Sequence, residues 1–174
     1  MITRRRLLAG AALFPFVRPA LALTCGEITP AQTEGPFFKT NTPQRITLIE
    51  PGSKAARLVV SGQVLTRECK PLKGALLDFW HADESGEYDN RGFRYRGHQF
   101  SDAEGRYRLE TILPAEYPGR ARHIHVKVQP AGGGVLTTQL YFPNERRNAR
   151  DGLFRRELVM QMTPTGQGAF DFVV

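Results

Sequence analysis

The sequence predicts an all-β fold, namely an antiparallel β-sandwich of about seven or more strands joined by long loops. Three observations support this class. Apolar or alternating runs are short, Gly, Pro, Asn and Asp stand between them, and no convincing amphipathic helix exceeds about three turns. The chain has 174 residues with 17 Gly and 12 Pro, which suits one turn-rich domain with its own core.

The expected strands follow from short apolar runs and from period-2 alternation, which places every second side chain on the core face. Turn sequences such as DESG at 83–86 and GGG at 132–134 separate them. Residues 29–45, which include Pro36 and Pro43, are expected to form an extended arm before the first strand. The strands are predicted at Leu58–Leu65, Ala75–His81, Gly105–Thr111, His123–Val128, Leu136–Phe142, Glu157–Met162 and Phe170–Val174.

Residues 1–22 have the features of a secretory signal. Arg4, Arg5 and Arg6 lead into the apolar stretch 7–17 and then into ALA at 20–22, a small-x-small cleavage site. The paired arginines resemble a twin-arginine signal, whose pathway exports folded proteins, so we expect a periplasmic protein with a mature domain at 23–174. A permanent membrane anchor is less favoured, because this apolar stretch is too short to span a bilayer.

The formal net charge is +7, but four of the arginines lie in this signal, which leaves about +3 on the mature chain. The remaining charge is spread along the chain, without a basic run interleaved with aromatic residues. This distribution argues against nucleic acid as a partner. The sequence leaves the oligomeric state open, with a homo-oligomer as one alternative.

The chain has two cysteines, Cys25 and Cys69, and both lie in the predicted mature domain. An oxidising periplasm would permit a Cys25–Cys69 disulfide, and two free thiols are the alternative. Neither cysteine belongs to a C-x-x-C motif that would indicate redox or zinc chemistry. A lipidated Cys25 is less favoured, because LT at 23–24 is a poor approach to one.

The side chains best suited to bind a metal lie in the segment HIH at residues 123–125. Alternation in a strand puts His123 and His125 on one face, and two neutral imidazoles suit a transition metal. On its own, such a pair is more often part of a solvated face. No Cys, Asp or Glu cluster is placed to complete a zinc site or a facial triad, so oxygen ligands are sought elsewhere, and Tyr117 stands six residues before His123.

Nine short segments occur in a characteristic order. FWHA at 79–82, GEY at 86–88, PAEYP at 114–118 and RARHIH at 120–125 resemble the iron-binding segments of the intradiol ring-cleavage dioxygenases. The likeness extends from residue 33 to residue 143, through TEGPFF at 33–38, GQV at 62–64, GA at 74–75, SDAEGRY at 101–107 and LTTQLYF at 136–142. No single segment is decisive, and the resemblance rests on the ordered set.

This resemblance implies an enzyme that binds one Fe(III) ion per chain through Tyr88, Tyr117, His123 and His125. It implies a small aromatic diol and O2 as substrates, intradiol cleavage of the catechol-type ring, and a cis,cis-muconate-type diacid as product. Phenolate is a hard anionic ligand that favours ferric iron, while imidazole fills positions without adding charge. Tyr117 is also assigned a catalytic role, as a tyrosinate that takes a proton from the substrate.

By position in the motif, the resemblance assigns Arg120 as the active-site arginine and Gln139 as its hydrogen-bonding neighbour. Arg122 competes with Arg120 for this role. The role of Glu116, immediately before Tyr117, is left open.

The other candidate rings are predicted to be structural or ordinary polar residues. Tyr95, Tyr107 and Tyr141 are expected to pack against the sandwich. His81 and His98 are not expected to be ligands, although His81 could line the entrance. The chain has a shorter Tyr117–His123 stretch than the catechol and protocatechuate enzymes, so the particular catechol cannot be read from the sequence.

Two rival classes remain at the sequence level. A non-catalytic β-sandwich binding module, similar to transthyretin-like or carboxypeptidase-regulatory domains, would explain the strands but not the joint occurrence of the tyrosines, histidines and arginine. A zinc or copper enzyme would use the two histidines and leave the tyrosines without a role.

Overall fold

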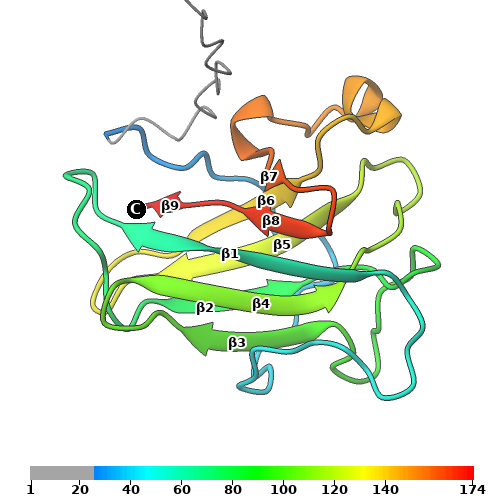
Figure 1. Ribbon diagram of the computed structural model, residues 1–174, viewed down its shortest axis with the longest axis horizontal. Helices are drawn as coiled ribbons and strands as arrows, with labels where there is room; N and C mark the ends of the chain where they lie inside the picture. Colours follow the sequence, from blue (N-terminus) through cyan, green and yellow to red (C-terminus); the bar gives the residue numbers. More distant parts are fainter. Residues whose placement is uncertain (1–25) are drawn as a thin grey trace, which may run out of the picture.

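The computed structural model describes residues 26–174, which form two β-sheets packed face to face (Figure 1). This arrangement confirms the predicted all-β sandwich. The first sheet contains β1 (Arg57–Leu65), β4 (Arg106–Ile112), β7 (Gln161–Met162), β8 (Gln167–Ala169) and β9 (Phe172–Val173). The second sheet has the order β3 (Arg96–Phe100), β2 (Leu76–Trp80), β5 (His123–Gln129), β6 (Leu136–Tyr141).

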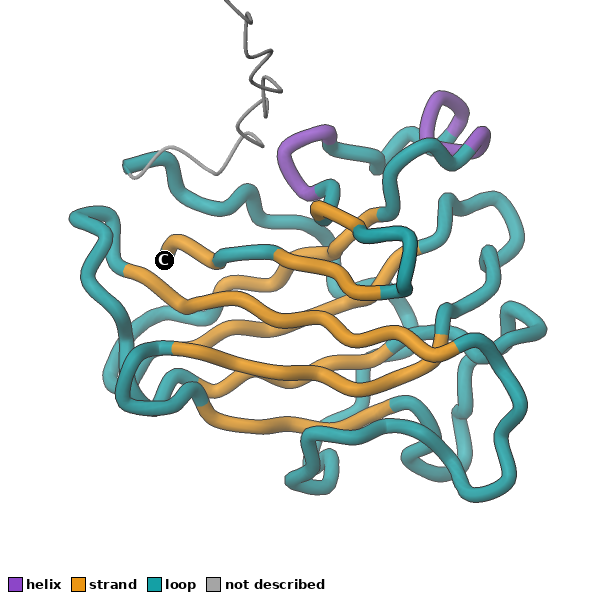
Figure 2. Tube along the Cα trace, viewed as in Figure 1, coloured by secondary structure: helices purple, strands orange, loops and turns teal. Residues whose placement is uncertain are grey.

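Pairing within the second sheet is antiparallel throughout, which fixes the faces of its strands. In the first sheet β1 pairs antiparallel with β4, whereas its pairings with β8 and β9 are parallel. Figure 2 shows that most of the strands lie in the middle of the molecule and that loops gather at both ends. Side chains carried by different loops can therefore meet at one end of the sandwich.

The core lies between the two sheets and consists of the apolar side chains that alternate inward. On β5 these are Ile124, Val126 and Val128, and on β2 they are Leu77 and Phe79, all fully buried. Because side chains alternate across a strand, the residues between them face away from this core. His123 and His125 therefore lie on the outer face of the second sheet.

That outer face is covered by the segment before β1, which confirms the predicted extended arm. The backbone of this segment pairs with the sheet at two edges, where Gln32 N donates to Thr137 O (2.8 Å) and Arg45 N to His98 O (2.9 Å). Between these edges, an ion pair of 2.6 Å joins Glu34 to Lys127 on β5. The arm excludes water from side chains that would otherwise be on the surface.

Two details of the predicted strands were wrong. The expected strand Glu157–Met162 is instead the 3₁₀ helix η2 (Arg156–Leu158) followed by the two-residue strand β7, and the expected strand Phe170–Val174 shortens to β9. Strands β3 and β8 were not predicted, and a second 3₁₀ helix, η1 (Arg146–Arg150), follows β6. These short strands are mostly polar or only two or three residues long, so they lack the apolar alternation on which the prediction depended.

The predicted signal at 1–22 and Cys25 lie outside the described residues. Cys69 is disulfide-bonded, while its expected pairing with Cys25 stays a prediction. Within residues 26–174, no helix has the length and apolar character needed to cross a membrane.

Candidate metal centre

The candidate centre lies on the outer face of the second sheet, at the end where β5 begins and β2 finishes (Figure 1). The antiparallel register places Trp80 and Gln139 on either side of His125, and Tyr141 beside His123. Directly opposed residues in a sheet share a face, so these five side chains form one patch. The indole of Trp80 stacks on the imidazole of His125, with ring centroids 4.8 Å apart and planes at 7°.

Three side-chain atoms converge at this patch. The hydroxyl oxygen of Tyr88 lies 3.2 Å from Nε2 of His123, and that nitrogen lies 3.0 Å from Nε2 of His125. All three side chains are buried, with exposed fractions of 8% for Tyr88, 4% for His123 and 3% for His125. Such separations are those of neighbouring ligands around one metal ion with bonds of about 2 Å.

The protonation of the two histidines leaves nitrogen lone pairs available. Nδ1 of His123 lies 2.6 Å from the carbonyl oxygen of Ala121, so it carries the proton and Nε2 does not. Burial lowers the pKa of His123 to about 4 and also lowers that of His125 well below its usual value. Both imidazoles are therefore neutral at pH 7, as metal binding requires.

Tyr88 is a phenol whose ionisation depends on nearby positive charge. Burial raises the pKa of Tyr88, and the charges of Arg120 and Arg96 oppose that rise only in part. A buried phenolate is favoured when a cation neutralises it, which a metal ion in contact with the oxygen would do.

Two loops bring the second tyrosine to the same place. The ring of Tyr117 packs edge-on against Tyr88 (centroids 5.7 Å apart), and Phe37 of the arm stacks on Tyr88 (4.4 Å) while contacting Tyr117 edge-on (5.2 Å). Gly86 makes this approach possible, because its φ is +89° and an added Cβ would lie 2.4 Å from the carbonyl oxygen of Glu116.

Replacing Gly86 with alanine is expected to separate the two tyrosine loops and to weaken metal binding by about tenfold or more. The new methyl group must displace backbone, and such overpacking costs about 1–3 kcal/mol. Gly132→Ala is the matched control, because Gly132 also has positive φ (+71°) but open space around it. Iron content per chain after dialysis would be measured for both variants. Equal iron retention would contradict a positioning role for Gly86.

A cavity of about 330 Å³ adjoins the two tyrosines. Phe37, Tyr88 and Tyr117 form its aromatic part, while the exposed residues Glu87 and Asn90 contribute its polar edge. Its volume and aromatic wall fit one small aromatic molecule.

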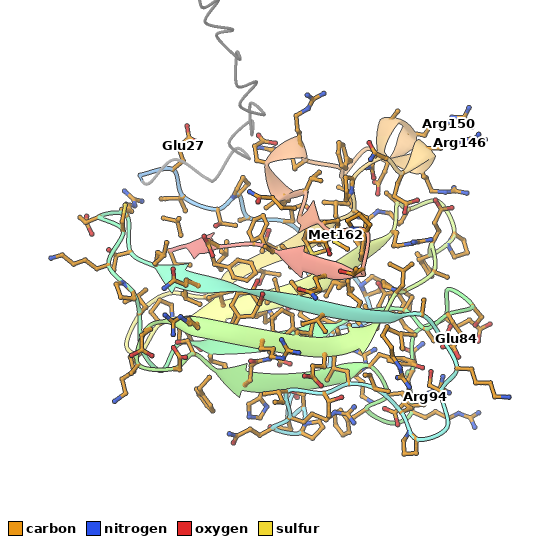
Figure 3. All side chains as sticks on the ribbon, in the orientation of Figure 1. Glu27, Glu84, Arg94, Arg146, Arg150 and Met162 are labelled. Atoms are coloured by element: carbon orange, nitrogen blue, oxygen red, sulfur yellow. The ribbon has the colours of Figure 1, made fainter. Side chains whose placement is uncertain are left out.

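Figure 3 shows Glu84 and Arg94, from the loop between β2 and β3, at the same end of the sandwich as Arg146 and Arg150 of η1.

The structure also brings Arg120 and Gln139 together. Nη2 of Arg120 donates to Oε1 of Gln139 at 2.6 Å, and Nε2 of Gln139 donates to the carbonyl oxygen of Thr33 at 3.0 Å. Arg122 points elsewhere, since it forms a 3.2 Å ion pair with Glu145. Between the two arginines, Arg120 is therefore the one that adjoins the histidines.

Several residues have roles that differ from the sequence-based expectation. Tyr141, predicted to be structural, places its hydroxyl 3.2 Å from Nη2 of Arg120 and 3.0 Å from Oε1 of Gln139. Asp151, which the sequence reasoning missed, binds the same arginine.

His81 does not line the entrance, because it is buried between the carbonyl oxygen of Ala82 and Oγ1 of Thr111. Glu116 forms a 2.7 Å ion pair with Arg147.

The donor set at this patch fits a transition metal. Nε2 of His123 has one lone pair, for which the hydroxyl of Tyr88 and Nε2 of His125 compete. A cation bound by all three atoms resolves this competition, and the Nδ1–H···O=C bond of His123 is the support that metal-binding histidines usually have. Across the described chain, no group of three or more His, Cys, Asp or Glu side chains gathers as a metal site. The candidate centre takes its oxygen donors from tyrosine.

Comparisons with known proteins show the family to which the chain is related. A family model described as Dioxygenase matches residues 33–171. The protocatechuate 3,4-dioxygenase β chain of Burkholderia cepacia is 33% identical over 143 residues, which cover 72% of this chain and 60% of the relative. Catechol 1,2-dioxygenase of Acinetobacter baylyi is 29% identical over 148 residues, covering 68% of this chain and 48% of the relative. The chain thus spans about half to three-fifths of these curated relatives.

Solved structures share the sandwich. The dioxygenase domain of a dioxygenase carbohydrate-binding protein fusion from Streptomyces sp. SirexAA-E has a TM-score of 0.82 and 53% identity, over 85% of this chain and 98% of that one. 3-Chlorocatechol 1,2-dioxygenase from Rhodococcus opacus 1CP has a TM-score of 0.77 and 27% identity, over 83% of this chain and 72% of that one.

The fold and the site together define a β-sandwich protein with a candidate metal centre of tyrosine and histidine. With the family match over residues 33–171, the chain belongs to the intradiol ring-cleavage dioxygenase family. The resemblance predicted from the sequence is confirmed.

Proposed function

We propose that the chain uses Fe(III) and O2 to cleave a catechol-type ring between its two hydroxylated carbons, giving a cis,cis-muconate-type diacid. Both oxygen atoms enter the product as the carbon–carbon bond breaks. The observation that carries the proposal is the convergence of the Tyr88 hydroxyl and the two imidazole Nε2 atoms within 3.2 Å, beside an aromatic cavity. The curated relatives are named for catechol, chlorocatechol, hydroxyquinol and protocatechuate.

Tyr88, Tyr117, His123 and His125 would hold the iron. When bound, Fe(III) supplies a Lewis acid that withdraws charge from the catechol ring and activates it towards dioxygen. The neutral histidines and the buried Tyr88 provide the fixed part of this site. Tyr117 is half-buried and borders the cavity, so its oxygen is the one suited to accept a proton from a substrate hydroxyl.

The remaining polar residues orient and stabilise the substrate. Arg120 presents a positive charge to the site, where it would stabilise negative charge that builds on the ring during oxygen addition. Gln139 holds that guanidinium through its Oε1 atom. The arm residue Phe37 contacts both tyrosines and helps to exclude water from the reaction.

The proposal is tested by iron content, colour and product analysis of the purified mature protein. We expect a reddish protein from tyrosinate-to-iron charge transfer, with about one iron per chain, because two phenolates favour the ferric state. Oxygen uptake with catechol, protocatechuate, hydroxyquinol and substituted catechols should yield the product of cleavage between the hydroxyls. A colourless, iron-free protein after expression with ample iron, or cleavage beside the hydroxyls, would contradict the proposal.

We also propose that the protein is exported through a twin-arginine signal and works in the periplasm without a membrane anchor. This proposal depends on residues 1–22 and on the two cysteines of the mature chain. Replacing Arg4 and Arg5 with lysine should retain the protein in the cytoplasm, since the pathway reads the paired arginines. Cell fractionation and the mass of the exported chain, expected to begin near Leu23, would test it. Mass analysis without reduction would show whether Cys25 and Cys69 are paired.

A further inference from the structure

The guanidinium of Arg120 is held along one side by a set of hydrogen bonds. Its Nε donates to both carboxylate oxygens of Asp151, at 3.1 Å and 3.0 Å. Its Nη2 donates to Oε1 of Gln139 and to the hydroxyl of Tyr141. No partner for Nη1 is found in residues 26–174, so this nitrogen is the one left to meet a substrate.

Asp151 is arranged as the fixed end of this set. Only 1% of its side chain is exposed, and its carboxylate also accepts hydrogen bonds from the backbone N–H groups of Ala121 (2.8 Å) and Leu153 (2.9 Å). Burial alone would raise the pKa of Asp151, but these backbone donors and the charge of Arg120 lower it below its usual value. The carboxylate is therefore ionised and immobile at neutral pH.

The position of Asp151 in the chain explains why it can act as an anchor. It follows η1 directly, and its backbone N–H donates to the carbonyl oxygen of Arg147 at 3.0 Å. The bond from Ala121 N ties this segment to the loop that precedes β5. One carboxylate thus connects the η1 segment, the loop that carries Arg120, and the start of the strand that carries the histidines.

We propose that Asp151 is the positioning residue that fixes the Arg120 guanidinium for ring cleavage. The inference rests on the proposed function. A donor that is already oriented stabilises developing charge without reorganising during the reaction, whereas a long flexible arginine must first be ordered. Loss of Asp151 should therefore lower kcat through Arg120 and should leave iron binding intact.

A double-mutant cycle on the iron-loaded mature protein tests this. Asp151→Asn removes the charge and replaces one of the two carboxylate oxygens with an amide nitrogen, so Arg120 loses one acceptor and only one of the backbone N–H groups of Ala121 and Leu153 keeps its acceptor. We expect kcat to fall about 10- to 100-fold, with KM and iron content little changed. In an Arg120→Ala background the same change should alter kcat by less than about twofold, because the two residues act as a unit. Glu145→Gln, which breaks the Arg122 ion pair, is the matched control and should retain full kcat.

A second readout does not depend on turnover. In the mature chain loaded with diamagnetic Ga(III), the NMR signal of the Arg120 Nε–H group, assigned by its loss in Arg120→Ala, should exchange slowly with water. Asp151→Asn should make this exchange faster by on the order of tenfold, because the hydrogen bond to the charged acceptor is lost. If Asp151→Asn does not fold, Asp151→Glu, which moves the carboxylate by one methylene, takes its place in both measurements.

Wild-type turnover separates the two proposals. Absence of ring cleavage by the iron-loaded wild type would contradict the proposed function itself. Turnover by the wild type, together with unchanged kcat in Asp151→Asn or an equal loss in both backgrounds, would overturn only the positioning role.

Discussion

Replacing His125 with phenylalanine is expected to abolish iron binding and ring cleavage while the protein remains folded. His125 contributes one of the four proposed ligands, and even changes behind a ligand cost about 10- to 100-fold in metal affinity. We therefore expect affinity to fall by more than about 100-fold. The fold should tolerate the change, because the new ring can stack on Trp80 and Nδ1 of His125 has no hydrogen-bond partner in the described chain.

The measurements are iron per chain, visible absorption and thermal unfolding of the same preparations. His98→Gln is the control, because His98 lies on the edge strand β3 of the same sheet, separated from β5 by β2 and outside the cluster. It should keep both iron and colour. A His125→Phe protein that still bound a full equivalent of iron would remove His125 from the ligand set.

Much of the arrangement of the candidate site could be predicted from the sequence because its parts depend on local geometry. Alternation alone places His123 and His125 on one face of a strand, and the structure has them on the outer face of β5. The two tyrosine segments and the segment at Arg120 were found by their order in the chain, which a family likeness preserves. The structure then brings Tyr88, Tyr117, His123 and His125 to one end of the sheet.

The residues that sequence reasoning missed act through contacts between distant segments. Asp151 lies 31 residues from Arg120, and the surrounding RDG reads as an ordinary turn. Tyr141 alternates with apolar residues on β6, so its ring suggested packing rather than the hydrogen bond to Arg120. Strand β3 escaped prediction because its sequence, RGHQF, is mostly polar although Arg96 and Gln99 are buried. Only the tertiary structure buries them, since Nε of Arg96 donates to the carbonyl oxygen of Asp89, and Oε1 of Gln99 accepts from the backbone N–H of Arg108 on β4 of the other sheet.

The arm before β1 also explains how an outer sheet face can hold a reactive site. A sheet of a sandwich normally leaves this face to solvent, and ionisable groups there keep ordinary properties. Here the arm places Phe37 on the tyrosines and Thr33 beside Gln139, and burial lowers the pKa of His123 to about 4. The proposed chemistry therefore depends on the arm as much as on the strands.

Replacing Arg120 with alanine is expected to lower kcat by about 100- to 1,000-fold while the protein keeps its iron and its colour. Removing one preorganised donor to developing negative charge costs about 2.7–4 kcal/mol in related sites, which corresponds to this factor. Arg120 donates to Asp151 and Gln139 rather than to any of the proposed ligands, so the metal should stay bound. Because the lost interaction strengthens during the reaction, KM should change much less than kcat.

Arg122→Ala is the control that tests the choice between the two arginines. Arg122 pairs with Glu145 and lies over the ring of Phe142, so its loss should leave kcat nearly unchanged. Arg120→Lys should not restore turnover. The ammonium group of lysine lacks the planar fork of donors by which the guanidinium binds Asp151 and Gln139 at once. Oxygen uptake at saturating substrate measures all three variants. Full turnover in Arg120→Ala with a loss in Arg122→Ala would transfer the charge-stabilising role to Arg122.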